Sequence, residues 1–120
     1  MLRRTDDPEL IGLAGETFAA RTLCRRGWRL LARRLRTSAA EVDLLFLEGR
    51  ELVCVEVKTG RRGPRFRPGM RVDARRLDRL WEAARLLGRR YGRKARVDVA
   101  EVLTGTEIEV VAWRELRHPL

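Results

Sequence analysis

Two acidic residues and one lysine interrupt neighbouring apolar segments of this 120-residue chain, at spacings that suit metal-ion chemistry. Asp43 lies within the run EVDLLFL (41–47), and Glu56 and Lys58 lie within LVCVEVKT (52–59). Carboxylate oxygens are the ligands that Mg²⁺ and Mn²⁺ prefer. A lysine ammonium can position or deprotonate a water molecule, which a permanently charged guanidinium does poorly. Lys58 is one of only two lysines among 27 Lys and Arg residues, so this combination predicts a site for a divalent cation.

The two runs are predicted to form a β-hairpin, and its register decides whether the two carboxylates meet. Side chains alternate between the faces of a strand, which puts Asp43 on the face of Leu45, and Glu56 on the face of Lys58. A turn of two or of four residues places Asp43 directly opposite Glu56, whereas a one-residue slip would move Glu56 to the other face. We adopt the even register. Facing residues have Cβ atoms about 5 Å apart, so the two carboxylates repel each other and a cation is expected between them.

Two kinds of cation satisfy this requirement. A divalent metal ion would be held by Asp43 and Glu56, with its other coordination positions left for water and phosphate. The alternative is a structural ion-pair cluster, in which Lys58 and a nearby arginine balance the two carboxylates. The spacing alone leaves both open.

Glu16 offers a third carboxylate from the predicted first helix. It shares a helical stripe with Ala19, Ala20 and Leu23, which directs it towards the sheet. The alternative is an exposed glutamate at the helix edge, paired with an arginine. Gly12 and Gly15 would let this helix approach another backbone closely.

The elements that position these residues are predicted to form one domain over residues 1–120. The expected order is α-β-β-β-α-β-β, an α/β fold with a mixed central sheet flanked by helices. Asp7-Pro8 starts the first helix and Gly27 ends it, while Asp73 caps the second helix. The expected helices span 9–26 and 74–91, and the expected strands span 28–35, 41–47, 52–59, 97–103 and 107–113.

The net charge of +10 and a pI near 11.3 predict a polyanionic partner, most often nucleic acid. A Gly-, Pro- and Arg-rich segment at about 60–71 is expected to be a mobile basic loop. It starts directly after the proposed site, so a nucleic-acid backbone held there would lie near the metal ion. The expected phosphate contacts are Arg61, Arg62, Arg65, Arg67, Arg71, Arg75 and Arg76.

Other functional classes find little support in the sequence. No stretch reaches the ~20 apolar residues of a membrane span, and the N-terminus lacks a secretory h-region, so we expect a cytoplasmic protein. Cys24 and Cys54 fall in apolar runs without metal-binding spacing and are expected to be buried free thiols. His118 is the only histidine, which excludes a His-based zinc site and a Ser-His-Asp triad.

The chain resembles the YraN-like family of small bacterial proteins. The resemblance rests on G12-x-x-G-E-x-x-A19, E41-V-D-L-L45, V55-E-V-K-T59 and R96-V-D-V99, in the family's order and spacing. That family is similar to Holliday-junction resolvases and restriction endonucleases, so the resemblance implies a restriction-endonuclease-like fold. Four positions depart from the family pattern without removing a proposed ligand: Arg34, Ala40, Gly60 and Arg76.

The resemblance also implies roles for individual residues. Asp43 and Glu56 would bind Mg²⁺ or Mn²⁺, Lys58 would position water, and Glu16 would complete the site. The backbone carbonyl of Val57 would join the coordination. The expected function is therefore a metal-dependent endonuclease that binds nucleic acid, with branched DNA as a candidate substrate. A non-catalytic nucleic-acid-binding module and an interaction scaffold on a larger assembly are the alternatives.

The sequence does not distinguish DNA from RNA as the substrate, and it indicates no base-sequence preference. A symmetric homodimer would supply the two sites needed to cut both strands of a duplex. No segment identifies its interface.

Overall fold

The computed structural model describes residues 8–61, 73–104 and 109–113 of the chain, with side chains at 14–60 and 73–103. Two helices and five strands follow one another in the predicted order α-β-β-β-α-β-β. Their bounds are α1 Pro8–Arg25, β1 Arg29–Arg36, β2 Glu41–Glu48, β3 Glu51–Arg61, α2 Ala74–Tyr91, β4 Ala95–Thr104 and β5 Glu109–Trp113.

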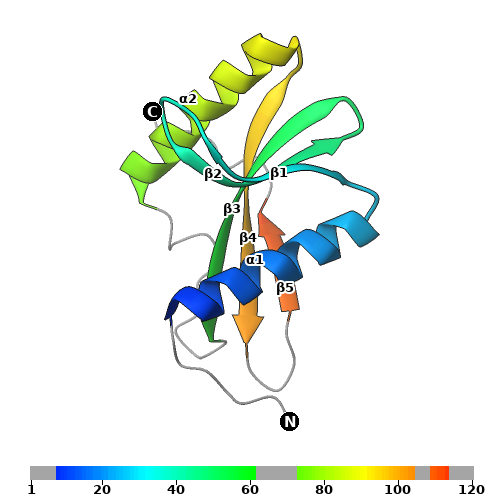
Figure 1. The fold of residues 1–120 in the computed structure, drawn as a ribbon, viewed down its shortest axis with the longest axis vertical. Helices are drawn as coiled ribbons and strands as arrows, with labels where there is room; N and C mark the ends of the chain where they lie inside the picture. Colours follow the sequence, from blue (N-terminus) through cyan, green and yellow to red (C-terminus); the bar gives the residue numbers. More distant parts are fainter. Residues whose placement is uncertain (1–7, 62–72, 105–108, 114–120) are drawn as a thin grey trace.

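The strands form one mixed sheet in the order β1-β2-β3-β4-β5 (Figure 1). Neighbouring strands are antiparallel except β3 and β4, which run parallel and are connected through α2. Parallel neighbours require such a crossover, and a helix is its usual form. The mixed α/β architecture confirms the predicted fold class and is compatible with a restriction-endonuclease-like fold.

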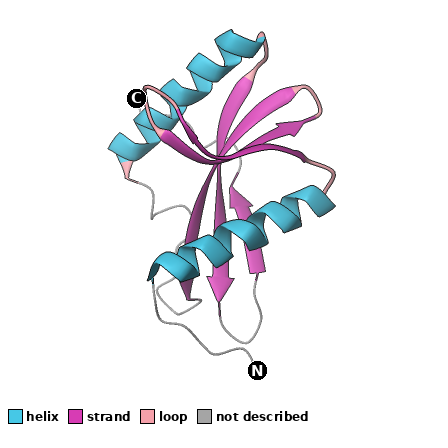
Figure 2. Ribbon diagram, viewed as in Figure 1, coloured by secondary structure: helices cyan, strands magenta, loops and turns pink. Residues whose placement is uncertain are grey.

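The two helices cover opposite faces of the sheet (Figure 2). The helix α1 packs through Ala19, Ala20 and Leu23 onto a cluster that contains Val53 and Val55. The helix α2 packs through five buried residues onto the other face, which carries Leu45, Leu52 and Cys54. Those five residues are Leu77, Leu80, Ala83, Ala84 and Leu87. This division agrees with the predicted alternation of side chains along β3.

The hairpin between β2 and β3 has the predicted even register. Leu47 pairs with Leu52 and Glu48 pairs with Glu51, which leaves Gly49 and Arg50 as a two-residue turn. Gly49 adopts a φ of +59°, a left-handed conformation that costs glycine little. Of the two turn lengths that the sequence allowed, two or four residues, the structure has the turn of two.

The first two strands are less regular than predicted. A register shift between Leu30 and Ala32 gives β1 an extra residue, which is a β-bulge. In β2, Val42 packs in the same cluster as Leu45, whereas Leu44 between them packs on the α1 face. Residues two apart in a regular strand share a face, so the simple alternation predicted for the whole of β2 is wrong at Val42–Leu44.

Two further expectations need correction. Cys24 is exposed, because Leu23 takes the core-facing position of α1 and the next residue points about 100° away; only Cys54 is buried as predicted. Gly60 and Arg61 end β3 instead of starting a loop. The remainder of the expected basic loop, 62–71, and His118 lie outside the described residues. No helix in the described ranges is long and apolar enough to cross a membrane.

Candidate active site

The candidate site lies where β2 separates from β3. Paired residues of these strands end at Leu44 and Val55, while β3 continues beside β4 as far as Arg61 (Figure 1). Asp43 lies just beyond the last pair, and its Oδ2 accepts a hydrogen bond of 2.9 Å from the Val57 backbone N–H. At this point the Asp43 side chain, instead of the backbone of β2, accepts the hydrogen bond from β3. This bond holds the Asp43 carboxylate next to the residue that follows Glu56.

Asp43 and Glu56 are close enough to perturb each other's ionisation. Burial raises the pKa of Asp43 to about 8, and hydrogen bonding and charge repulsion from Glu56 act in the same direction. The charge of Glu16 contributes as well. The predicted juxtaposition of Asp43 and Glu56 is therefore present in the structure. Without a cation between them, the folded protein favours a proton on Asp43.

Arg76, from the first turn of α2, supplies the charge that Glu56 requires. Its guanidinium donates to both oxygens of Glu56, from Nε at 2.8 Å and from Nη2 at 3.2 Å. Burial opposes ionisation of Glu56, but the hydrogen bonds from Arg76 and Asp43 and the charges of Arg76 and Lys58 lower its pKa. The side chain of Glu56 is only 4% exposed, so leaving its negative charge without a partner would cost folding stability.

Asp73 holds Arg76 in place from the start of the helix. It is the N-cap residue of α2, and its Oδ1 accepts a hydrogen bond of 2.8 Å from the Arg76 backbone N–H. The Arg76 side chain also donates to the Glu41 carbonyl oxygen at 2.8 Å. Arg76 was expected among the phosphate contacts; the structure places it at the carboxylates instead.

Lys58 lies near this pair, as its effect on the pKa of Glu56 shows. In the parallel ladder it is paired with Glu101 of β4, a residue that is 1% exposed. Sequence reasoning missed Glu101, although an acidic residue in the apolar run 97–103 was the available signal. The backbone pairing thus puts a buried acidic residue of β4 next to Lys58 in the sheet.

Glu16 approaches the site from α1 on the other face of the sheet. Its Oε2 forms an ion pair of 3.2 Å with Arg34 Nη2, while its Oε1 is buried and has no hydrogen-bond partner. The side chain is 12% exposed. Both interpretations of Glu16 are thus partly correct, because it faces the sheet and is paired with an arginine.

The close approach of α1 to β3 depends on Gly15. A Cβ atom at Gly15 would lie 2.1 Å from Thr59 Oγ1, far inside van der Waals contact. Thr59 follows Lys58 directly in β3, so this contact brings α1 against the strand that carries Glu56 and Lys58. The side-chain surroundings of Gly12 lie outside the described part of the chain.

The donor set suits a hard divalent cation. Asp43 and Glu56 contribute carboxylate oxygens from adjacent strands, whereas the Glu16 Oε1, which has no hydrogen-bond partner, belongs to α1 and does not complete a three-residue group with them. Within the described residues, however, no three His, Cys, Asp or Glu side chains gather closely enough to hold a metal ion by themselves. A metal ion here would be held by two carboxylates, with its other ligands drawn from water, backbone or substrate oxygens.

Of the seven arginines expected to contact phosphate, only Arg75 and Arg76 have described side chains. Arg75 is exposed at the start of α2, and Arg76 bonds to Glu56. Arg61 ends β3, but its side chain is not described. The other four lie outside the described residues: Arg62, Arg65, Arg67 and Arg71.

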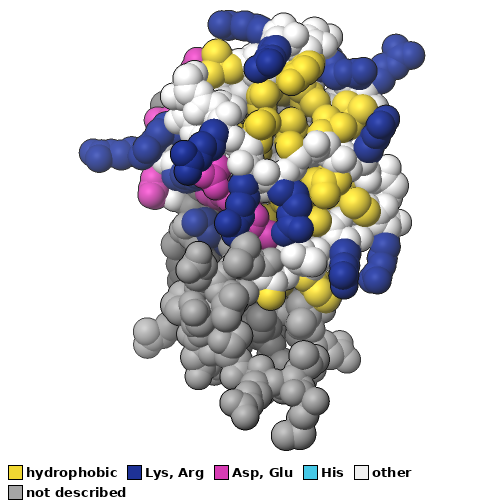
Figure 3. All heavy atoms as spheres, viewed as in Figure 1, with side chains coloured by type: hydrophobic (Ala, Val, Ile, Leu, Met, Phe, Trp, Pro, Cys, Tyr) yellow, Lys and Arg dark blue, Asp and Glu magenta, His cyan; other side chains and the backbone are white. Residues whose placement is uncertain are grey.

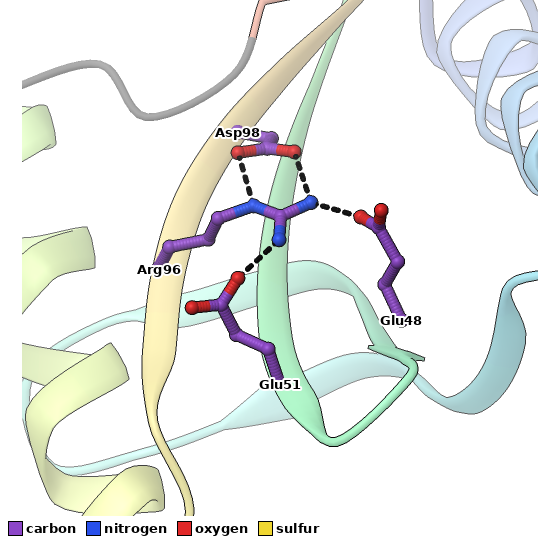
Figure 4. A network of polar contacts seen from close by, with 4 residues as sticks. All are labelled: Glu48, Glu51, Arg96 and Asp98. Atoms are coloured by element: carbon purple, nitrogen blue, oxygen red, sulfur yellow. Dashed lines mark hydrogen bonds and ion pairs between the residues drawn. The ribbon is translucent and has the colours of Figure 1, made fainter.

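A second charged cluster, which sequence reasoning missed, surrounds Arg96 of β4 (Figure 4). Arg96 donates to both oxygens of Asp98, at 3.0 and 3.2 Å, and to Glu48 and Glu51 at the β2–β3 turn. Its guanidinium also lies 5.4 Å from the centre of the Trp28 ring. Glu48 faces Glu51 directly, so this cluster fixes the hairpin end of the sheet onto β4.

Comparison with known proteins places the chain among relatives that match most of its length. The family model described as "Uncharacterised protein family UPF0102" matches residues 15–102. A UPF0102 protein from Kosmotoga olearia is 42% identical over 78% of this chain and 82% of its own. One from Symbiobacterium thermophilum is 43% identical over 81% and 85%. One from Rhizorhabdus wittichii is 40% identical over 99% and 92%.

Proposed function

Since the chain belongs to the uncharacterised protein family UPF0102, whose description carries no activity, we propose a function from the geometry of its site. The protein binds nucleic acid and hydrolyses phosphodiester bonds with Mg²⁺ or Mn²⁺. DNA, including branched DNA, is the proposed substrate. A symmetric homodimer would bring two such sites to a duplex, one for each strand.

One observation carries this proposal: half-buried Asp43 and buried Glu56 meet at the point where two strands separate. A structural role alone gives no reason to bring two carboxylates together in an apolar surrounding, because their repulsion costs stability. A nuclease site does give a reason, because two carboxylates with Lys58 beside them are what a divalent cation and an attacking water require. The net charge of +10 supplies the attraction for a phosphate backbone.

Each residue then has a defined task. Asp43 and Glu56 hold the metal ion, with the Val57 carbonyl as a further candidate ligand. When bound, a divalent ion lowers the pKa of a coordinated water and offsets charge that develops on the phosphate. Lys58 orients the attacking water by donating a hydrogen bond from Nζ. Glu16, whose Oε1 has no hydrogen-bond partner, accepts a hydrogen bond from a water at the edge of the site.

Arg76 favours a second candidate function, a nucleic-acid-binding module without turnover. Its two hydrogen bonds satisfy both oxygens of Glu56, so the pair is complete without a metal ion. In that case Asp43, Glu56 and Arg76 stabilise the fold, and the net positive charge of the chain carries the function. The two candidates differ in whether a divalent cation can compete with Arg76 for Glu56.

A cleavage panel distinguishes these candidates. Linear duplex, single strand, flap, four-way junction and RNA are incubated with the protein and Mg²⁺ or Mn²⁺. The endonuclease proposal predicts cleavage of at least one substrate by the wild type, and none by Glu56→Gln, which still binds. Equal cleavage by both preparations would reveal a contaminating nuclease. Binding without cleavage of any substrate would favour the non-catalytic module.

A further inference from the structure

A second basic surface surrounds the C-terminal end of α2, at the opposite end of that helix from Arg76. A hollow of about 870 Å³ lies there between the β2–β3 turn and residues 91–94. Two smaller hollows, of about 440 and 380 Å³, share lining residues with it. Figure 3 shows Lys and Arg side chains around this end of the molecule. We call it the distal basic surface, formed by Arg50, Arg89, Arg90, Tyr91, Arg93 and Lys94.

The charge of this surface is not balanced from within. The acidic residues that line the three hollows are Glu48 and Glu51, and both are bonded to Arg96. The cations of the distal basic surface are exposed. The side chains of Arg89 and Lys94 form no hydrogen bond or ion pair with any other described residue. The surface therefore presents uncompensated positive charge to solvent.

Helix stabilisation explains only part of this charge. Arg89 and Arg90 lie in the last turn of α2, where cations interact favourably with the helix dipole. Arg50 belongs to the β2–β3 turn, and Arg93 and Lys94 follow the Gly92 cap, so none of these three belongs to that turn. Arg93 donates to the Arg50 carbonyl oxygen at 3.2 Å, which holds the two segments together.

The arrangement identifies the ligand class. The cations are distributed over three adjoining hollows and do not converge on one point, so a single phosphate could not contact them together. A polymer of phosphates could. Tyr91 lies among them with 55% of its surface exposed and lines two of the three hollows. Clustered exposed cations are typical of surfaces that bind a nucleic-acid backbone, and an exposed aromatic ring adds a platform on which an unpaired base can stack.

We propose that the distal basic surface binds the backbone of the same nucleic acid that reaches the Asp43–Glu56 site. This inference rests on the proposed nucleic-acid binding, but not on cleavage. From Arg76 in the first turn to Arg89 in the last, α2 rises about 20 Å, at 1.5 Å per residue. That length matches about six base pairs of duplex, so one bound duplex can contact both ends of the helix.

The test compares two double variants that each remove two exposed positive charges. Arg89→Gln/Lys94→Gln alters the distal basic surface. Arg21→Gln/Arg25→Gln is the matched control, because both residues are exposed on α1, which covers the other face of the sheet. Binding to a 20-base-pair duplex is measured by fluorescence anisotropy over a series of salt concentrations, without divalent metal. Melting curves establish that each variant folds.

The distal variant is expected to bind about tenfold more weakly than wild type, and its log–log salt dependence is expected to be shallower by about 1.8. The control is expected to stay within about threefold of wild type. Lys94→Gln alone should give about half of the change in slope, which tests the surface should the double variant unfold. Equal losses in both double variants would overturn this inference but leave the proposed function intact. A wild-type protein that binds no nucleic acid would overturn both.

Discussion

Arg76 donates hydrogen bonds to both oxygens of Glu56, at 2.8 and 3.2 Å, and so occupies the carboxylate that a metal ion would need. A guanidinium and a divalent cation cannot use the same lone pairs at once. A metal ion that binds Glu56 must therefore either use the remaining lone pairs beside Arg76 or displace Arg76, and displacement would make its charge available to phosphate. If a metal ion binds Glu56 in competition with the Arg76–Glu56 pair, the site can serve a metal-dependent enzyme. If it does not, the pair is purely structural.

Replacing Arg76 should lower the stability of the metal-free protein and increase the stabilisation that Mn²⁺ provides. Breaking a buried ion pair costs about 3 kcal/mol, so Arg76→Gln should lower the melting temperature in EDTA. Mn²⁺ should then raise the melting temperature of Arg76→Gln more than that of wild type, because the competing cation is gone. Arg79→Gln, an exposed position on the same helix, is the control and should behave as wild type. An equal effect of Mn²⁺ on all three proteins would mean that the ion does not reach Glu56.

The raised pKa of Asp43 predicts how stability depends on pH. The folded protein releases the Asp43 proton near pH 8, whereas an unfolded chain releases it near the ordinary value of 3.8. Between these values the folded state binds more protons, so in EDTA the free energy of unfolding should fall as pH rises from about 4 to about 8. Asp43→Asn should flatten this part of the curve, as measured by urea denaturation at several pH values. Parallel curves for the two proteins would contradict the assigned pKa.

Gly15 should be intolerant of even one added methyl group. Its Cβ would lie 2.1 Å from Thr59 Oγ1, and overpacking of this kind costs about 1–3 kcal/mol. Gly15→Ala should therefore destabilise the protein in denaturant titrations. Thr59→Ala removes the clashing oxygen, so the double variant should recover most of the loss. No recovery would show that α1 and β3 are not in contact at this point.

Arg96 should be more sensitive to substitution than any of the exposed arginines. Its side chain is 8% exposed and neutralises carboxylates from both the hairpin turn and β4. Arg96→Met would remove both hydrogen bonds that Arg96 donates to buried Asp98, at a cost of about 3–5 kcal/mol. Thermal melts should show this loss, whereas Arg93→Met should change the melting temperature by only a few degrees. Equal effects at both positions would contradict a stabilising role of the cluster.

The hairpin that carries the site was predictable because its signals are local. A continuous apolar run marks each strand, and Gly49 allows a two-residue turn, so the register followed from counting along the chain. The departures from it came from tertiary packing. The bulge after Leu30 and the position of Val42 depend on how the sheet bends between two helices, which no periodicity records.

The role of individual charges was harder to predict than the position of the strands. Arg76 and Arg75 are adjacent in sequence and equal in charge, yet one is paired with Glu56 and the other is exposed. The Arg96 cluster depends on parallel pairing between β3 and β4, which brings residues 45 or more positions apart into contact. Such pairing is set by the crossover through α2 and leaves no local signal.

Direct measurement of Mn²⁺ binding tests the central proposal, that Asp43 and Glu56 together hold a divalent cation. Isothermal titration calorimetry of the wild-type protein should show one ion bound per chain. Asp43→Asn and Glu56→Gln should each abolish that binding, while Glu82→Gln on the exposed face of α2 should retain it. Mn²⁺ binding of equal affinity in all four proteins, or no binding by the wild type, would contradict the proposed metal site.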